Sequence, residues 1–364
     1  MKTLYIRPIF LTALKRFAAF GAVATLLLTA TTSWAAGGPR NSYTKTNLVS
    51  DVPGVANVTD PNLVNAWGIA LGNEFWVSDN GTGVSTLYDL DGNPLPLVVT
   101  VPPSASNTEG TSAPTGQAFN SGSGFVVSQG TASGPSIFIF VSEDGGISGW
   151  NPGVLPDQAV LAVDHGADGA VYKGATLGTT TGGDRLYVSN FNAGKVEIYD
   201  QNFNEIDTTQ TFVDPTIPSG YAPFGIQNIN GSIYVTYAKQ DPDKHDDVPG
   251  PGHGFVSVFD ADGNFIQRLI SHRPLNSPWG LALAPDGFGK ASGDLLVGNF
   301  GNGRINSFNV NTGASHGPLR TANGGPMSIP GLWALLFVDT DLYITAGPEG
   351  ESHGLFAEIA ADAP

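Results

Sequence analysis

The 364-residue sequence contains no cysteine, which excludes disulfide bonds and all thiolate chemistry. Basic residues are scarce: 16 Lys and Arg stand against 32 Asp and Glu, for a formal net charge of −16. This charge repels nucleic acid and anionic membrane surfaces, so neither is an expected partner. The sequence also lacks a Gly-x-Ser-x-Gly elbow, a phosphate-binding loop and a His-Glu-x-x-His motif. We therefore expect a fold stabilised by burial, with an activity that no short motif identifies.

The N-terminus has the features of a secretory signal. Lys2, Arg7, Lys15 and Arg16 precede an apolar run over residues 17–28, and small residues lead to a cleavage point after Ala35 or Ala36. The run is short for a permanent anchor of roughly 20 residues. We predict a cleaved signal over residues 1–36, a linker over residues 37–42, and no membrane span after cleavage. The mature protein is expected to be exported, periplasmic or extracellular.

A unit of roughly 50 residues occurs six times in the rest of the chain. The units begin at Ala66, Pro114, Ala170, Pro223, Pro278 and Gly331. Each start leads into an apolar strand and a second strand, then through a Gly-rich turn into a third, as in GDRLYVSNFNAGKVEIYD (183–200). Asp-Gly pairs at 91–92, 144–145 and 262–263 are typical hairpin signals before a weaker fourth strand. The pattern predicts an all-β, six-bladed β-propeller with four-stranded blades over residues 43–360 and a short tail over 361–364.

Three strand assignments matter for the site. In the second unit we expect the second and third strands at residues 124–128 and 137–141, and in the third unit the fourth strand at residues 208–212. Residues 43–52 alternate like a strand ahead of the first unit. We predict that this segment pairs as the outermost strand of the last blade, which covers an exposed edge. A loose N-terminal tail is the alternative.

The unit LYVSNFNAGKVEIYD (186–200) resembles an NHL-type propeller repeat. Together with DPNLVNAWGIA (60–70), FWVSDNGTGVSTLYD (75–89) and PWGLALAP (278–285), the order of the units resembles an uncharacterised bacterial family of exported propellers. Some members of that family carry a C-terminal PEP-type sorting tail. This chain ends AEIAADAP, so the resemblance does not imply sorting through such a tail. It implies the propeller fold and transfers no activity.

Propeller geometry predicts a ligand funnel on one face. The start of each innermost strand and the end of each second strand open there, because the two strands are antiparallel. The candidate residues are Asn65, Trp67, Asp79, Asn80, Gln129, Asn190, Asn192, Trp279, Asn299 and Trp333. Asn and Asp at these places are also typical turn residues, and the aromatic residues also suit packing between blades.

Two loops on the same face are candidate sites for Ca²⁺ or another divalent cation. They contribute Asp164, His165 and Asp168 from one loop, and His245, Asp246, Asp247 and His253 from the other. Their spacing matches no defined metal motif, and a solvated acidic loop is the alternative.

Three functions remain open. The first is a monomeric binding or interaction scaffold for a small molecule, a glycan or a protein. The second is a metal-dependent hydrolase similar to the gluconolactonase-type propellers, which hold a divalent cation with a Glu, an Asn and an Asp. That resemblance implies Asn190, Asn299 and Asp79 as ligands, but no Glu stands at an obvious equivalent position. The third is a lyase with His165 or His253 as acid or base.

Overall fold

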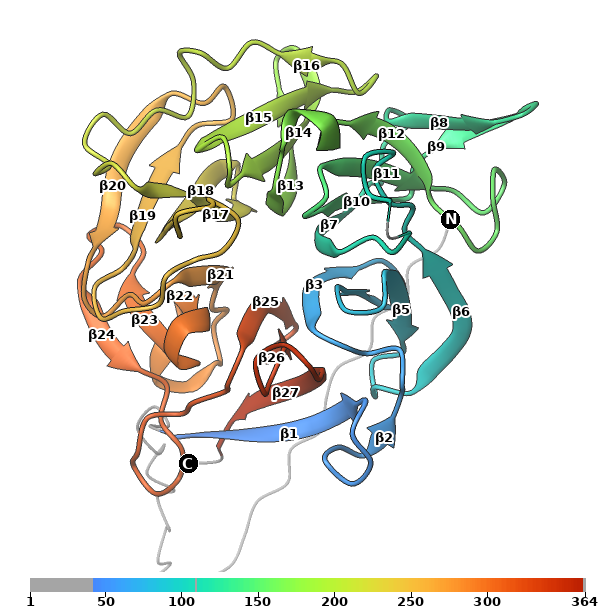
Figure 1. Ribbon diagram of the computed structural model, residues 1–364. Coiled ribbons are helices and arrows are strands. Elements are labelled where there is room, and N and C mark those ends of the chain that lie inside the picture. The colour runs from blue at the N-terminus through green and yellow to red at the C-terminus, as the bar shows by residue number, and fades with distance from the viewer. Residues whose placement is uncertain (1–41, 109, 363–364) are drawn as a thin grey trace, which may run out of the picture. The chain divides into compact units, whose positions relative to one another are not determined.

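The computed structural model describes residues 42–108 and 110–362 (Figure 1). The predicted signal and most of the linker lie outside these residues. The described elements are strands and three single-turn 3₁₀ helices: η1 (Gly166–Asp168), η2 (Gly289–Ala291) and η3 (Phe300–Asn302). In this part of the chain, no helix is long and apolar enough to cross a membrane.

Six sheets are arranged as the blades of a propeller, which confirms the predicted fold class (Figure 1). Blade 1 contains β3 (Ala66–Leu71), β4 (Phe75–Asp79), β5 (Val84–Tyr88) and β6 (Pro94–Thr100). Blade 2 contains β7 (Pro114–Phe119), β10 (Phe138–Ser142), β11 (Gly146–Trp150) and β12 (Val160–Asp164). Blade 3 contains β13 (Tyr172–Thr180), β14 (Gly183–Asn190), β15 (Lys195–Asp200) and β16 (Glu205–Ile206).

The other three blades repeat the antiparallel order. Blade 4 contains β17 (Tyr221–Ile229), β18 (Ser232–Lys239), β19 (Phe255–Phe259) and β20 (Phe265–Ser271). Blade 5 contains β21 (Pro278–Leu283), β22 (Asp294–Asn299), β23 (Ile305–Asn309) and β24 (Ser315–Pro318). Blade 6 contains β25 (Leu332–Val338), β26 (Asp341–Ala346), β27 (Leu355–Ala361) and β1 (Tyr43–Ser50), with β2 (Val58–Thr59) beside β1.

The N-terminal strand closes the ring as predicted. β1 pairs antiparallel with β27 from Tyr43–Ala361 to Ser50–Leu355, and Figure 1 shows the two strands side by side. The Tyr43 hydroxyl also donates to the carbonyl of Phe288 and accepts from the N–H of Ala291, both in blade 5. The N-terminal strand β1 therefore covers the edge of β27, whose backbone groups would otherwise be unpaired.

Blade 2 corrects the expected strand order. Residues 126–129 form β8 (Val126–Gln129), which pairs only with β9 (Ala132–Pro135) as a separate hairpin among the described strands. The second strand is β10, and β11 is the third. The physical reason is burial: every residue of β10 is buried, as the middle of a blade requires, whereas three of the four residues of β8 are exposed. In blade 3 the fourth strand is the two-residue β16, and residues 208–212 lie outside it.

The core lies between neighbouring blades. One cluster, for example, joins Tyr187 and Ile198 of blade 3 to Ile226 and Val235 of blade 4. Around the axis the innermost strands approach so closely that a Cβ on Gly225 would overlap the backbone carbonyl of Trp279 in the next blade. Glycine at this repeated position is therefore a packing requirement.

Candidate functional site

Six residues, one from each blade, occupy equivalent axial positions. Each directly follows the last paired residue before a register shift between the first and second strands of its blade. These axial residues are Trp67, Thr115, Lys173, Phe224, Trp279 and Trp333. A register shift re-aims side chains, here toward the ring centre. The propeller axis is therefore surrounded mostly by aromatic side chains, with one lysine among them.

The aromatic axial residues pack into a floor. The rings of Trp67 and Trp333 stack with centroids 3.6 Å apart, and Phe300 stacks on Trp333 at 4.1 Å. Trp279 meets Trp333 edge-on at 6.1 Å. The indole N–H of Trp333 donates to Asn65 Oδ1 at 2.9 Å, and that of Trp279 donates to the Lys173 carbonyl at 2.8 Å. The floor is thus fixed both by ring contacts and by hydrogen bonds.

Lys173 is the charged member of the axial set. Its side chain is only 2% exposed, and its Nζ pairs with Glu143 and, at 3.3 Å, with Asp246 Oδ1. The Nζ also lies 5.3 Å from the ring centroid of Trp67 and 6.0 Å from that of Phe191. Burial lowers the pKa of Lys173, but the adjacent carboxylates outweigh burial, and the net pKa is raised. Lys173 is therefore held as a buried ammonium ion.

A chain of amides and carboxylates joins Lys173 to the loops of blades 1 and 6. Glu143 Oε2 accepts from Asn80 Nδ2 at 2.8 Å. Asn65 Nδ2 donates to Asn80 Oδ1 at 3.1 Å and to Glu351 Oε2 at 2.8 Å. Asn65, Asn80, Glu143, Lys173, Asp246 and Glu351 are named here the central site. Segments separated by more than 280 residues thus meet in one hydrogen-bonded network, as Asn65 and Glu351 show.

The loop between β18 and β19 supplies the exposed side of the site. Asp246 is 68% exposed, and His245 Nδ1 lies 2.9 Å from its Oδ1. That hydrogen bond lowers the pKa of Asp246 to about 2 and raises the pKa of His245. Burial raises the pKa of Asp247 to about 6, and one of its buried oxygens has no hydrogen-bond partner among the described residues.

The carboxylates of the site repel one another. Burial raises the pKa of Glu351, and the neighbouring Glu143 and Asp246 raise it further, while Lys173 and a hydrogen bond from Asn65 act in the opposite direction. Burial is the largest cause of the raised pKa of Glu351 and repulsion from the other carboxylates adds to it, so Lys173 and Asn65 do not offset the two together. The site is therefore suited to an additional cationic group.

Several predicted residues do lie at this centre. Asn65, Trp67, Trp279 and Trp333 form part of the floor and network, and Asp246 closes the site. Among the described residues, the possible metal-holding group is Glu143, His245 and Asp246, whose ligand atoms all lie within 4.8 Å of one another. His245 and Asp246 were candidates from the sequence, and Glu143 was not.

Three other funnel candidates are buried within their own blades. Asp79 accepts a hydrogen bond from Thr86, Asn190 donates to Glu197, and Asn299 donates to the Pro274 carbonyl. Successive side chains of a strand point to opposite faces. The residue after each of them takes part in the centre instead: Asn80 bonds to Glu143, Phe191 lies near Lys173, and Phe300 stacks on Trp333. The structure thus does not bring Asp79, Asn190 and Asn299 together.

Gln129 lies away from the centre because it belongs to the separate β8–β9 hairpin, where it is exposed. Glu143, which directly follows β10, takes the corresponding place in blade 2. Lys173 was not predicted as a site residue, although an alignment of the repeated units would have identified it. Aligning Gly174 with Gly68 and Gly280 places Lys173 at the position of Trp67 and Trp279.

The remaining loop candidates lie in other networks. Asp164 accepts hydrogen bonds from Ser104 and the Ala105 N–H, Asp168 lies in η1, and His253 Nδ1 contacts the Val248 carbonyl at 2.8 Å. His165 Nδ1 lies 3.0 Å from the Tyr172 hydroxyl.

The Tyr172 hydroxyl in turn donates to the buried Glu197 at 2.8 Å. Despite its burial, Glu197 has a lowered pKa because it accepts hydrogen bonds from Asn190, Tyr199 and Tyr172. This network ties His165 to the interior of blade 3 rather than to the central site.

The blade order and the polar centre define a six-bladed β-propeller. No protein-family model matches the chain. The uncharacterized protein R648 of Acanthamoeba polyphaga mimivirus is 37% identical over 337 residues, covering 89% of this chain and 82% of that protein. The uncharacterized protein L690 of the same virus is 36% identical over 339 residues, covering 89% and 88%. The chain therefore belongs to the family of these mimivirus proteins.

Solved structures share the fold. A protein of unknown function from Bacteroides thetaiotaomicron is similar with a TM-score of 0.54 and 11% identity, over 88% of this chain and 76% of that one. A catalytically inactive virginiamycin B lyase from Staphylococcus aureus, solved with quinupristin, has a TM-score of 0.50 and 12% identity, over 88% and 99%. At these identities the likeness shows the fold alone. The curated relatives are viral, and the bacterial, exported character expected from the sequence stays a prediction.

Proposed function

We propose that this propeller is a binding protein whose central site takes a small ligand with a cationic amine. One observation carries the proposal. The buried ammonium ion of Lys173 pairs with two carboxylates, Glu143 and Asp246, and two more, Asp247 and Glu351, lie near enough for its charge to lower their pKa values. His245 adds at most one further positive charge, and it is bonded to Asp246. A bound amine would supply the missing charge.

Two further features support this ligand class. The pKa values of Asp247 and Glu351 are raised, so a nearby cation would stabilise their ionised forms. The Trp67 and Phe191 rings already face an ammonium, that of Lys173, at distances typical of cation–π contacts. We also propose export of the protein, on the basis of its predicted N-terminal signal.

Isothermal titration of the purified protein with putrescine, spermidine and choline tests the proposal. We expect at least one amine to bind, and Glu351→Gln to weaken that binding roughly tenfold through loss of one charge-assisted contact. Glu349→Gln is the matched control, because Glu349 lies two residues away with its side chain 78% exposed. Absence of binding by all three amines, or equal loss in both variants, would contradict the proposal.

A metal-dependent hydrolase is the second candidate, favoured by the proximity of Glu143, His245 and Asp246. An imidazole with two carboxylates suits Mn²⁺ or Zn²⁺, and such a metal activates water for hydrolysis. Lys173 already pairs with both carboxylates, which makes this the weaker proposal. Melting curves with Mn²⁺, Zn²⁺ and Ca²⁺ separate the two. A metal-induced rise in Tm that His245→Ala removes and His253→Ala keeps would favour the hydrolase.

A further inference from the structure

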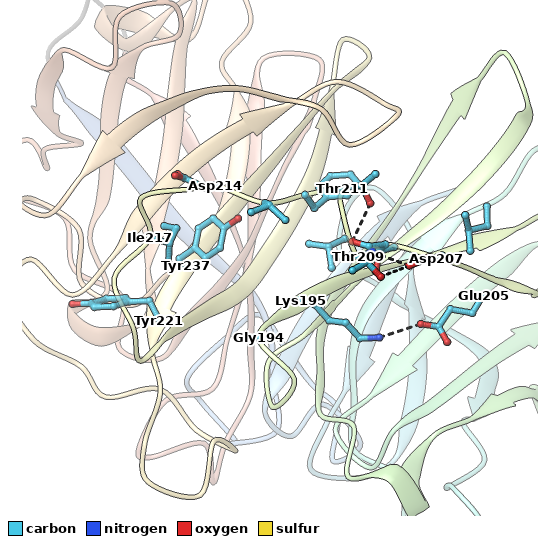
Figure 2. Close-up of a pocket in the computed structure, with 15 residues that line it drawn as sticks. Gly194, Lys195, Glu205, Asp207, Thr209, Thr211, Asp214, Ile217, Tyr221 and Tyr237 are labelled. Atoms are coloured by element: carbon cyan, nitrogen blue, oxygen red, sulfur yellow. Dashed lines mark hydrogen bonds and ion pairs between the residues drawn. The ribbon is translucent and has the colours of Figure 1, made fainter.

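A cavity of about 510 Å³ lies between blades 3 and 4 (Figure 2). It lies beside the short outermost strand of blade 3. β16 has 2 residues, whereas β20 in the next blade has 7. Residues 207–220 then run as a loop that contains Pro215 and Pro218 and supplies one wall. The volume falls in the range of about 300–1,000 Å³ that small-molecule sites occupy. We name this cavity the side pocket.

The charged groups that line the side pocket are mostly paired already. Lys195 Nζ lies 3.1 Å from Glu205 Oε1 and 3.2 Å from Glu197 Oε1. Asp214 accepts two hydrogen bonds from Arg268, at 2.7 and 2.8 Å. A charged ligand would therefore find no unpaired counter-charge here, and its desolvation would cost free energy without compensation. The pairing favours an uncharged ligand.

The uncharged lining offers hydroxyl groups and ring faces. Thr208, Thr209 and Thr211 lie on the loop wall, and Tyr221 and Tyr237 lie on the wall formed by blade 4. Tyr237 is only 4% exposed, and its hydroxyl has no hydrogen-bond partner among the described residues. Figure 2 shows this hydroxyl turned toward the segment that carries Thr209 and Thr211. A buried donor without a partner is costly, and a ligand oxygen would satisfy it.

We propose that the side pocket binds an uncharged saccharide, such as a disaccharide or the end of a neutral glycan. A sugar carries many hydroxyls that both donate and accept, which matches the threonine hydroxyls and the carboxylates of Glu205 and Asp207. The apolar C–H face of a sugar ring can pack against the aromatic ring of Tyr221. None of the residues that line the side pocket belongs to the central site, so this proposal is independent of amine binding.

Saturation-transfer NMR with the purified protein and maltose, cellobiose, lactose or N,N′-diacetylchitobiose tests this site. We expect at least one disaccharide to bind. Thr209→Trp should fill the pocket and weaken binding at least tenfold, and Gln210→Trp is the matched control, because Gln210 is exposed on the same loop and does not line the pocket. Tyr237→Phe should weaken binding roughly fivefold to tenfold by removing one hydrogen bond.

Two results would overturn the proposal. One is that none of the four disaccharides binds, and the other is that binding is unchanged in Thr209→Trp. Titration with putrescine keeps the two sites distinguishable, since Thr209→Trp should leave amine binding at the central site intact. An equal melting temperature for the Thr209 and Gln210 variants establishes that both are folded.

Discussion

Replacing Lys173 by methionine tests the role of the buried ion pair at the ring centre. Methionine keeps most of the side-chain volume but removes the charge. Glu143, only 13% exposed, then loses its principal counter-charge and keeps the hydrogen bond from Asn80. Removing one partner of a buried pair costs about 3–5 kcal/mol. We expect about 3 kcal/mol for Lys173→Met, because Glu143 retains some contact with solvent.

The double variant isolates the pair. Glu143→Gln removes the charge that Lys173→Met would leave uncompensated, so the combined variant should lie within about 1 kcal/mol of the natural protein. The coupling energy between the two sites should then be about 2–3 kcal/mol, near the top of the range for residues in contact. Lys195→Met is the control, because its ammonium is 45% exposed and contributes less than about 1 kcal/mol.

Urea unfolding followed by tryptophan fluorescence measures these differences, since Trp67 lies next to Lys173. A melting scan should show Lys173→Met lowered by about 6 °C, at about 2 °C per kcal/mol. If Lys173→Met costs less than about 1 kcal/mol, or if the two substitutions are additive, the ion pair does not stabilise the ring and the reasoning fails.

Three further predictions concern other parts of the molecule. Burial raises the pKa of Asp247 to about 6, so the free energy of unfolding should fall as pH rises from about 4 to about 6, where the buried carboxyl ionises. Asp247→Asn should abolish this fall and raise the free energy of unfolding by about 2 kcal/mol at pH 7. Urea titrations at several pH values measure the effect, and Asp243→Asn is the control that should not show it. Burial also raises the pKa of Asp79, so Asp79→Asn should stabilise the protein at neutral pH by about 1–3 kcal/mol, and an unchanged or lower urea midpoint would contradict this. Deleting residues 1–50 removes β1 and should cause aggregation on size-exclusion chromatography, whereas deleting residues 1–41 should leave a monomer, and equal behaviour of the two would argue against closure through β1.

The sequence by itself determined the six units, most of their strands and the closure of the ring, but not the strand order of blade 2 or the fourth strand of blade 3. Middle strands such as β10 and β14 contain short apolar runs, residues 138–141 and 186–188, and turns such as Asp262-Gly263 need the positive φ that Gly263 adopts. These signals are local, because they depend on residues a few positions apart. The repeat of about 50 residues then implied the blades without any knowledge of contacts between them.

Only the tertiary structure decided which side chains meet. Asp79 and Asn80 are adjacent in sequence, yet one is buried in blade 1 and the other bonds to Glu143 in blade 2. Asp and Asn have similar preferences for turns, so the sequence does not distinguish these two residues. Their positions relative to the end of β4 decide which side chain is buried in the blade and which contacts the next blade. The register shift after Tyr172 likewise turns Lys173 toward the centre, and Lys173 was not among the residues predicted from the sequence.

The composition of the central site depends on ring closure. Glu143, Asp246 and Glu351 come from three blades, and no periodicity along the chain links them. Their proximity follows from six sheets arranged around one axis, which brings one loop of each blade to the same point. Local apolar patterns encode the sheets, whereas the shared electrostatic environment exists only after the sheets have packed together.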